Sequence, residues 1–241
     1  MIASMPLIGV TLRGVLGRRR TWLMILLAML PVAVALLIRA GGGNPRAPII
    51  LDTLLIRAVM PLLALVFGTA ALGSELEDGT AIYLMIKPVP RWRILLAKML
   101  VAAGLTVALV FPATVATSLI TNGREALSMS ETLGYALVVS AGGVAYACAF
   151  VALSAFTGRA LILGLFYVLI WEGVLSGLLE GTRFLSIRQA SLGLAAQVTG
   201  VVTVPPPLDV ATSAWILIVV VIGAILLGSW RLSRFEITGS D

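Results

Sequence analysis

The amino-acid sequence predicts an all-α membrane protein, and three observations lead to that class. Of 241 residues, 60% are hydrophobic and 12% are charged, whereas soluble domains hold roughly 45–50% and about 25%. The mean hydropathy is +1.09, so most of a folded surface would be apolar. The apolar residues also gather in runs of roughly 20, the length that a helix needs to cross a bilayer. A water-soluble globular protein is therefore excluded.

An amphipathic stretch opens the chain and predicts an interfacial helix over residues 1–20. Its apolar residues recur at helical spacing: Met5, Ile8, Leu12 and Val15. A cleaved signal peptide is the alternative, because Arg19-Arg20 loosely resembles a twin-arginine signal and Ala33-Val34-Ala35 offers small cleavage-site residues. The remainder would then be secreted and should be polar, which it is not.

Six membrane-spanning helices are expected in a single domain over residues 1–241. Their ranges are 22–38, 51–73, 94–119, 132–156, 160–179 and 211–229. Pro61 lies inside the second span, where it predicts a kink, and Pro112 lies inside the third. The link of residues 157–159 is so short that the fourth and fifth spans must be antiparallel. The connection from Gly181 to Leu208 is too apolar to face water as an ordinary loop.

Lys and Arg are distributed unequally between the two sides that these spans define. Six spans place both termini on the same side of the membrane. That side holds eleven of the 17 basic residues: Arg13, Arg18, Arg19, Arg20, Lys87, Arg91, Arg93, Lys98, Arg159, Arg231 and Arg234. The more basic side faces the cytoplasm, so both termini and the polar segment 74–93 are predicted to be cytoplasmic. Topology thus accounts for the net charge of +6, and no nucleic-acid partner is expected.

Several classes of enzyme are excluded by what the sequence lacks. Histidine is absent and Cys148 is the single cysteine, so neither a His-based hydrolase nor a thiolate or His metal site is expected. The chain also has no G-x-x-x-x-G-K-[ST] phosphate loop. We therefore expect no catalytic residue and no metal ligand in this chain.

The polar segment 74–93 contains the signs of a short cytoplasmic helix. Ser74 and Glu77 have the spacing of a capping box, which predicts a helix start at Ser74. Pro88 and Pro90 would end that helix, and Arg91-Trp92-Arg93 marks the return to the membrane. An ordinary charged loop is the alternative.

This segment and its surroundings resemble the ATP-binding-cassette (ABC) type 2 permeases. The stretches Glu75–Thr80, Leu84–Arg91 and Ile94–Lys98 are similar to a family signature in which an acidic Gly-Thr stretch precedes a proline-centred turn, an Arg and an Ala-Lys that opens the third span. Tyr167–Gly173 with Gly181–Ile187 is similar to the fifth span and following loop in one branch. Pro90 departs from the Ser or Thr of many relatives, which leaves the docking inference intact.

The resemblance implies the permease subunit of an exporter in a prokaryotic cell membrane. It would pair with a second permease copy, as a homodimer or heterodimer, and bind two copies of an ABC ATPase; ATP and Mg²⁺ would act there, and this chain would hold no cofactor. The segment 74–93 would be a coupling helix, with short re-entrant or surface-lying helices between spans five and six. The implied docking residues are Ser74, Glu75, Glu77, Asp78, Gly79, Thr80, Tyr83, Lys87, Pro88, Arg91 and Lys98.

Two charges fall inside predicted spans. Glu172 lies roughly 12 Å and Arg57 roughly 9 Å from the outer ends of theirs, so they are expected to pair, either along a transport pathway or only to pin two helices. Close helix packing is predicted from small residues four apart, within one subunit or at a dimer seam. These residues are Gly173 with Gly177, Gly143 with Ala147, and Ala224 with Gly228.

Two other classes of function stay open at this point. A secondary transporter would use Glu172 as its coupling carboxylate and would work without ATP. A membrane anchor or accessory subunit would tolerate the loss of Glu75 and Glu77. The substrate does not follow from the sequence.

Overall fold

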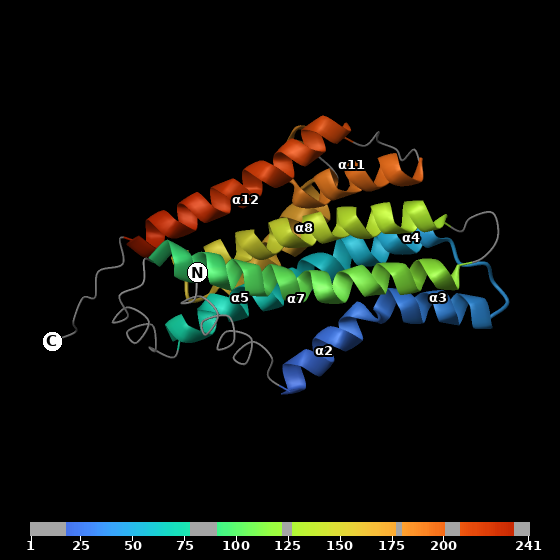
Figure 1. Cartoon of the computed structure of the whole chain (residues 1–241), viewed down its shortest axis with the longest axis horizontal. Coiled ribbons are helices and arrows are strands. Elements are labelled where there is room, and N and C mark those ends of the chain that lie inside the picture. The colour runs from blue at the N-terminus through green and yellow to red at the C-terminus, as the bar shows by residue number, and fades with distance from the viewer. Residues whose placement is uncertain (1–17, 78–90, 122–126, 177–179, 201–207, 234–241) are drawn as a thin grey trace.

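The computed structural model describes residues 18–77, 91–121, 127–176, 180–200 and 208–233. Every regular element in these ranges is helical, and the long helices run side by side in an elongated bundle (Figure 1). Many large apolar side chains on its outside are exposed, as a surface in contact with lipid requires. The sequence prediction of an all-α membrane protein is confirmed.

Four helices in the described part of the chain are long and apolar enough to cross a membrane: Ala47–Leu72, Trp92–Ile120, Met129–Phe156 and Val210–Ser233. A fifth candidate is the pair α2 (Arg18–Ala28) and α3 (Leu30–Ala40), which is bent by 43°. Pro31 in the first turn of α3 explains the bend, because its ring clashes with the preceding turn. The expected count of six is not confirmed by the described residues, because the apolar helix in the range 160–179 is only Ala160–Leu175.

The second span consists of three helical pieces in sequence: α4 (Ala47–Ile50), the π-helix η2 (Leu51–Val59) and α5 (Met60–Glu77). Pro61 is the second residue after the π-helix. Its ring would collide with the carbonyl of Arg57 in a regular α-helix, and widening the preceding turns to i→i+5 hydrogen bonds relieves that collision. Where the sequence predicts a kink, the structure thus has a change from π-helix to α-helix.

A long hairpin follows, made of α7 (Arg91–Ile120) and α8 (Met129–Phe156). Ser128 and Glu131 form a capping box at the start of α8: the Glu131 amide donates to Ser128 Oγ at 3.2 Å, and the Ser128 amide donates to Glu131 Oε2 at 2.7 Å. The pattern S-x-x-E thus starts a helix here.

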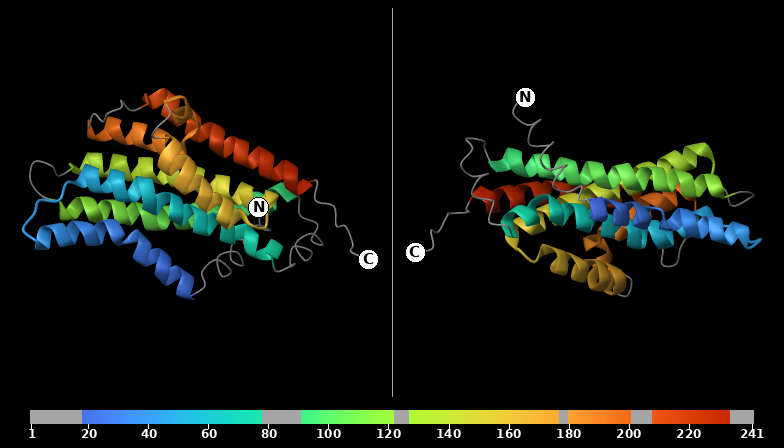
Figure 2. Two further views of the ribbon diagram at one scale, coloured as in Figure 1. Left: turned by 180° about the vertical axis from the view of Figure 1, so that it is seen from behind. Right: turned by 90° about the horizontal axis from the view of Figure 1, so that it is seen from below.

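Helix α8 is the centre of the core and packs against α5, α7, α11 and α12 (Figures 1 and 2). Small residues bring these helices close together. A Cβ on Gly68 of α5 would lie 2.8 Å from Cβ of Phe150, and one on Gly228 of α12 would lie 2.8 Å from Leu95 of α7. Of the predicted small pairs, Gly143 with Ala147 and Ala224 with Gly228 are buried inside this one chain.

The chain after α8 runs back along it in two pieces. The first is α9 (Ala160–Phe166) continued by the π-helix η3 (Tyr167–Leu175), seen in gold in Figure 2. The 3₁₀-helix η4 (Glu180–Leu185) then leads to α11 (Ile187–Thr199). Gly200 ends α11 with a φ of 65°, a left-handed conformation that glycine adopts without strain. The last helix, α12 (Val210–Ser233), returns along the bundle (Figure 1).

Candidate functional site

The predicted docking segment lies between the end of α5 and the start of α7. Six of its residues fall outside the described part of the chain: Asp78, Gly79, Thr80, Tyr83, Lys87 and Pro88. The backbone of α5 runs unbroken through Ser74, Glu75 and Glu77, and α7 begins at Arg91. The helix start predicted at Ser74 is therefore wrong, because an N-cap must stand outside its helix and Ser74 lies within α5.

Lys98, the last of the predicted docking residues, is buried. Its side chain is 2% exposed, and its Nζ donates a hydrogen bond of 2.5 Å to the carbonyl oxygen of Ala71. Ala71 lies near the end of α5, and Lys98 lies two turns into α7. Lys98 thus ties together the two helices that flank the docking segment.

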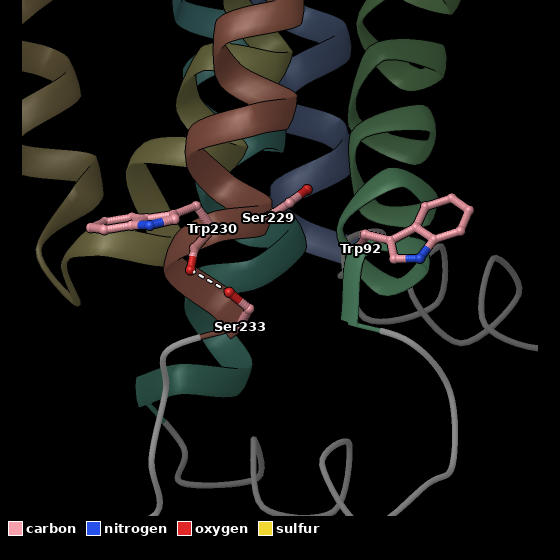
Figure 3. Close-up of a pocket in the computed structure, with 4 residues that line it drawn as sticks. All are labelled: Trp92, Ser229, Trp230 and Ser233. Carbon is pink, nitrogen blue, oxygen red and sulfur yellow. Dashed lines mark hydrogen bonds between the residues drawn. The ribbon is translucent and has the colours of Figure 1, made fainter.

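A hollow of about 500 Å³ opens at the same end of the bundle, between the start of α7 and the end of α12 (Figure 3). It is lined by Trp92, Ser229, Trp230 and Ser233. The guanidinium of Arg93 lies 5.2 Å from the centre of the Trp92 ring. Tryptophan and arginine at helix ends are typical of the membrane–water interface, so these side chains mark the level at which the bundle leaves the lipid.

Glu172 is a buried carboxylate whose oxygens accept several hydrogen bonds, and its side chain is 0% exposed. Two hydroxyl groups donate to it, from Tyr167 at 2.9 Å and from Ser186. The amide of Ile187 donates at 3.0 Å and that of Arg188 at 3.4 Å. Glu172 therefore lies at the N-terminus of α11, where unpaired amides and the helix dipole favour a negative charge.

The expected ion pair between Glu172 and Arg57 is absent from this arrangement. Arg57 is exposed and is not among the hydrogen-bond partners of Glu172 in the described structure. Its acidic neighbour is Asp52, whose carboxylate accepts a hydrogen bond from Tyr135. The prediction was wrong in its choice of partner because the N-terminus of α11 already supplies the donors that Glu172 needs.

Both charged sites lie in π-helical segments. Asp52 and Arg57 are five residues apart in η2, and Tyr167 and Glu172 are five apart in η3. Because a π-helix closes its hydrogen bonds from i to i+5, residues five apart lie about one turn apart on one face. In an α-helix the same two residues would point about 140° apart. The π-helical winding thus brings each polar pair together.

The packing against α8 fixes the depth of Glu172. A Cβ on Gly164 of α9 would meet the Phe150 ring at 3.2 Å, one on Gly142 would meet Ser191 of α11, and one on Gly134 would meet Val198 at 3.0 Å. Between these levels, Glu172 lies close to Tyr146 of α8. Tyr146 is ten residues from the end of α8, roughly 15 Å at 1.5 Å per residue. Glu172 is therefore deep in the bundle and not near its outer end.

The same contacts show that α9 with η3, and then α11, lie end to end along α8. Together the two pieces form a broken helix that runs antiparallel to α8, interrupted between Leu175 and Ser186. Other hydrogen bonds also cross the break: Gln189 Nε2 donates to the Ser176 carbonyl at 3.2 Å, and Trp171 Nε1 donates to the Leu185 carbonyl at 3.3 Å. Glu172 is the centre of the joint between the two pieces.

Sequence reasoning missed most of the residues around Glu172: Tyr146, Tyr167, Ser186 and Arg188. A signal was available for Ser186, which precedes the first helical residue of α11 as an N-cap does, and its Oγ accepts from the Gln189 amide at 3.0 Å. Gly173, predicted to pack closely, is exposed and has only its own helix nearby, and Gly177 lies outside the described residues.

An apolar bundle with fully enclosed charges defines a multi-pass membrane protein. A family model described as ABC-2 family transporter protein matches residues 16–171, which is more than half of the chain. The chain therefore belongs to the ABC-2 transporter family, and within an ABC transporter it is a membrane component and not the catalytic one. The match ends directly before Glu172. A search of curated proteins found no match.

Proposed function

We propose that this chain is the permease subunit of an ATP-driven exporter in a prokaryotic cell membrane. The observation that carries the proposal is the family match over residues 16–171, which includes both helices that flank the docking segment. Two copies of a separate ATPase would bind at that segment and would hold the ATP and Mg²⁺. A second permease copy, identical or different, would complete the transporter.

The connection between α5 and α7 supports a coupling role for residues 74–93. The apolar part of the second span ends at Leu72, yet the helix continues to Glu77. A continuous helix transmits movement at its end as a rigid body, whereas a flexible loop would absorb it. The Lys98 to Ala71 hydrogen bond would make α7 follow α5, so ATPase closure would move two spans together.

The broken helix supports a sixth crossing. Neither Ala160–Leu175 nor α11 reaches the length of a span alone, but end to end they follow α8 from Phe150 to Gly134. Irregular backbone within a membrane is tolerated where protein groups satisfy its polar atoms, and the hydrogen bonds from Gln189 and Trp171 to backbone carbonyls cross this break. With the pair α2 and α3 counted once, both termini would then face the cytoplasm.

Co-purification from the native host tests the proposal. The full-length chain is tagged, extracted in mild detergent and examined for associated proteins. We expect a protein with a phosphate loop, which should be lost from the Glu75→Ala/Glu77→Ala double variant because the acidic end of α5 is where it docks. The matched control is Asp209→Asn, which also removes an acidic charge but lies at the opposite end of the bundle.

Recovery of the intact chain without any nucleotide-binding partner would contradict the exporter. A chain that transports under a proton gradient alone would then be a secondary transporter, and a chain without transport would be an anchor. Retention of the ATPase by the double variant would place docking elsewhere.

A further inference from the structure

The joint at Glu172 contains two polar groups whose hydrogen bonding is incomplete. Tyr146 Oη is fully buried and lies close to the Glu172 carboxylate, yet it makes no hydrogen bond of good geometry in the described structure. Nε of Arg188, which is 6% exposed, is also without one. Buried polar groups are nearly always hydrogen-bonded, and leaving one unpaired costs about 1–3 kcal/mol. Two such groups around one carboxylate therefore call for a physical reason.

Tyr146 and most of the donors in use belong to different elements. The donors in use come mostly from the second helical piece: Ser186 and the amides of Ile187 and Arg188. Tyr146 belongs to α8, which lies alongside both pieces. If the N-terminus of α11 moves away from η3, Tyr146 is the hydroxyl already in position to take its place.

The contacts of α11 allow such a movement at one end of the helix. From Ser191 onward its residues pack tightly: Ser191 lies against Gly142, Gly193 against Ser213 and Leu208, and Val198 against Gly134. Its first residues are joined to η3 by hydrogen bonds to Glu172 and by the bond of 3.4 Å from Arg188 to the Val168 carbonyl. Hydrogen bonds can be exchanged, whereas interlocked small residues resist separation.

We propose that Glu172 is a latch between the two pieces of the broken helix, held by the N-terminus of α11 in this state and by Tyr146 of α8 in a second state. In this way the carboxylate keeps a hydrogen-bond donor when the joint opens. The proposal deepens the proposed function and rests on it, because it names the part of the permease that moves.

The distance between the two pieces provides the test. Spin labels are placed at Leu161→Cys in α9 and at Phe184→Cys just before α11, both exposed sites, in a Cys148→Ala background, and distances are measured by pulsed electron spin resonance on the full chain in lipid nanodiscs. Ser186→Ala removes one hydrogen bond of the latched state. We therefore expect the population at a second distance to rise about fivefold, the change that the loss of one hydrogen bond produces. Glu172→Gln should raise it as well.

Adding Tyr146→Phe to Ser186→Ala should lower that second population about fivefold again, because the open state loses its replacement partner. Ser213→Ala is the matched control: Ser213 Oγ is another buried hydroxyl without a partner, but it lies at the contact between α11 and α12. It should leave the two populations unchanged. An equal effect of Tyr146→Phe and Ser213→Ala, or a single distance in every variant, would overturn the latch.

Thermal unfolding gives a second and independent readout. Tyr146→Phe alone removes a hydroxyl that is unpaired in the latched state, so its melting temperature should equal or exceed that of the wild type. Tyr167→Phe removes a bond that is made and should melt lower. A melting temperature of Tyr146→Phe as low as that of Tyr167→Phe would also refute the proposal. Neither measurement needs an ATPase or a substrate, so failure here is distinct from failure of the permease assignment.

Discussion

At the scale of single residues, the structure shows two ways of placing a carboxylate in an apolar bundle. Asp52 accepts a hydrogen bond from Tyr135 and has Arg57 one π-helical turn away. Glu172 instead uses the amides and the cap of a helix N-terminus. An isolated charge at the bilayer centre costs about 2.5–3.5 kcal/mol on insertion scales. The sequence therefore indicates that Glu172 needs partners. It does not specify which kind, because four neutral hydrogen-bond donors stabilise a carboxylate as well as one cation does.

The two S-x-x-E patterns give a prediction at this scale. Ser128→Ala should lower stability by about 1 kcal/mol, the usual loss for an N-cap, and thus the melting temperature in detergent by roughly 2–4 °C for a chain of this size. Ser74→Ala should change it far less, because the backbone of α5 passes through Ser74 and alanine favours a helix. Equal losses in the two variants would mean that Ser74 also caps a helix.

At the scale of elements, small residues decide which helices meet. Gly142 of α8 faces both Ser191 of α11 and Met60 of α5, so a side chain there would displace one of them. Gly104 of α7 has no atom within 4 Å of the position a Cβ would take and is exposed. The two glycines look alike in sequence, since each stands in an apolar helix.

This contrast predicts opposite effects of one substitution. Gly142→Ala should destabilise the bundle by about 1–3 kcal/mol, the usual cost of overpacking. Gly104→Ala should stabilise it by up to about 1 kcal/mol, because alanine is the better helix former. Melting temperatures in the same detergent check both. If Gly142→Ala were as stable as Gly104→Ala, α11 would not lie against α8 as closely as the structure has it.

At the scale of the whole molecule, the number of crossings decides how the ends are arranged. Both termini share one side only if the number of spans is even, and the Lys and Arg count then assigns that side to the cytoplasm. The described helices provide four long spans and one bent pair. The even number is reached only if the two pieces along α8 together cross the membrane, so the topology depends on the broken helix.

Labelling of single cysteines in intact cells tests that topology in a Cys148→Ala background. A reagent that cannot cross the membrane should label Ser128→Cys and Asp209→Cys, which lie at the start of α8 and before α12. Arg159→Cys and Ser233→Cys should be labelled only after permeabilisation. Labelling of Arg159→Cys and Asp209→Cys from the same side would mean that the broken helix does not cross.

The class of the protein and the approximate place of its long helices follow from the sequence alone. A run of roughly 20 apolar residues is a local property, and it is sufficient for a helix to cross a bilayer. The sequence also identified Glu172 as a residue needing partners. The family signature lay partly in local stretches such as Ile94–Lys98, which is why the resemblance was correct before any helix was placed.

The tertiary structure decided what depends on neighbours. Whether Ser74 or Ser128 caps a helix depends on whether the chain turns before it, and the chain turns only before Ser128. Whether Glu172 binds Arg57 or the N-terminus of α11 depends on how α11 packs on α8, through Gly142 and Gly134. Partner choice is set by packing between segments distant in sequence, and no local pattern specifies it.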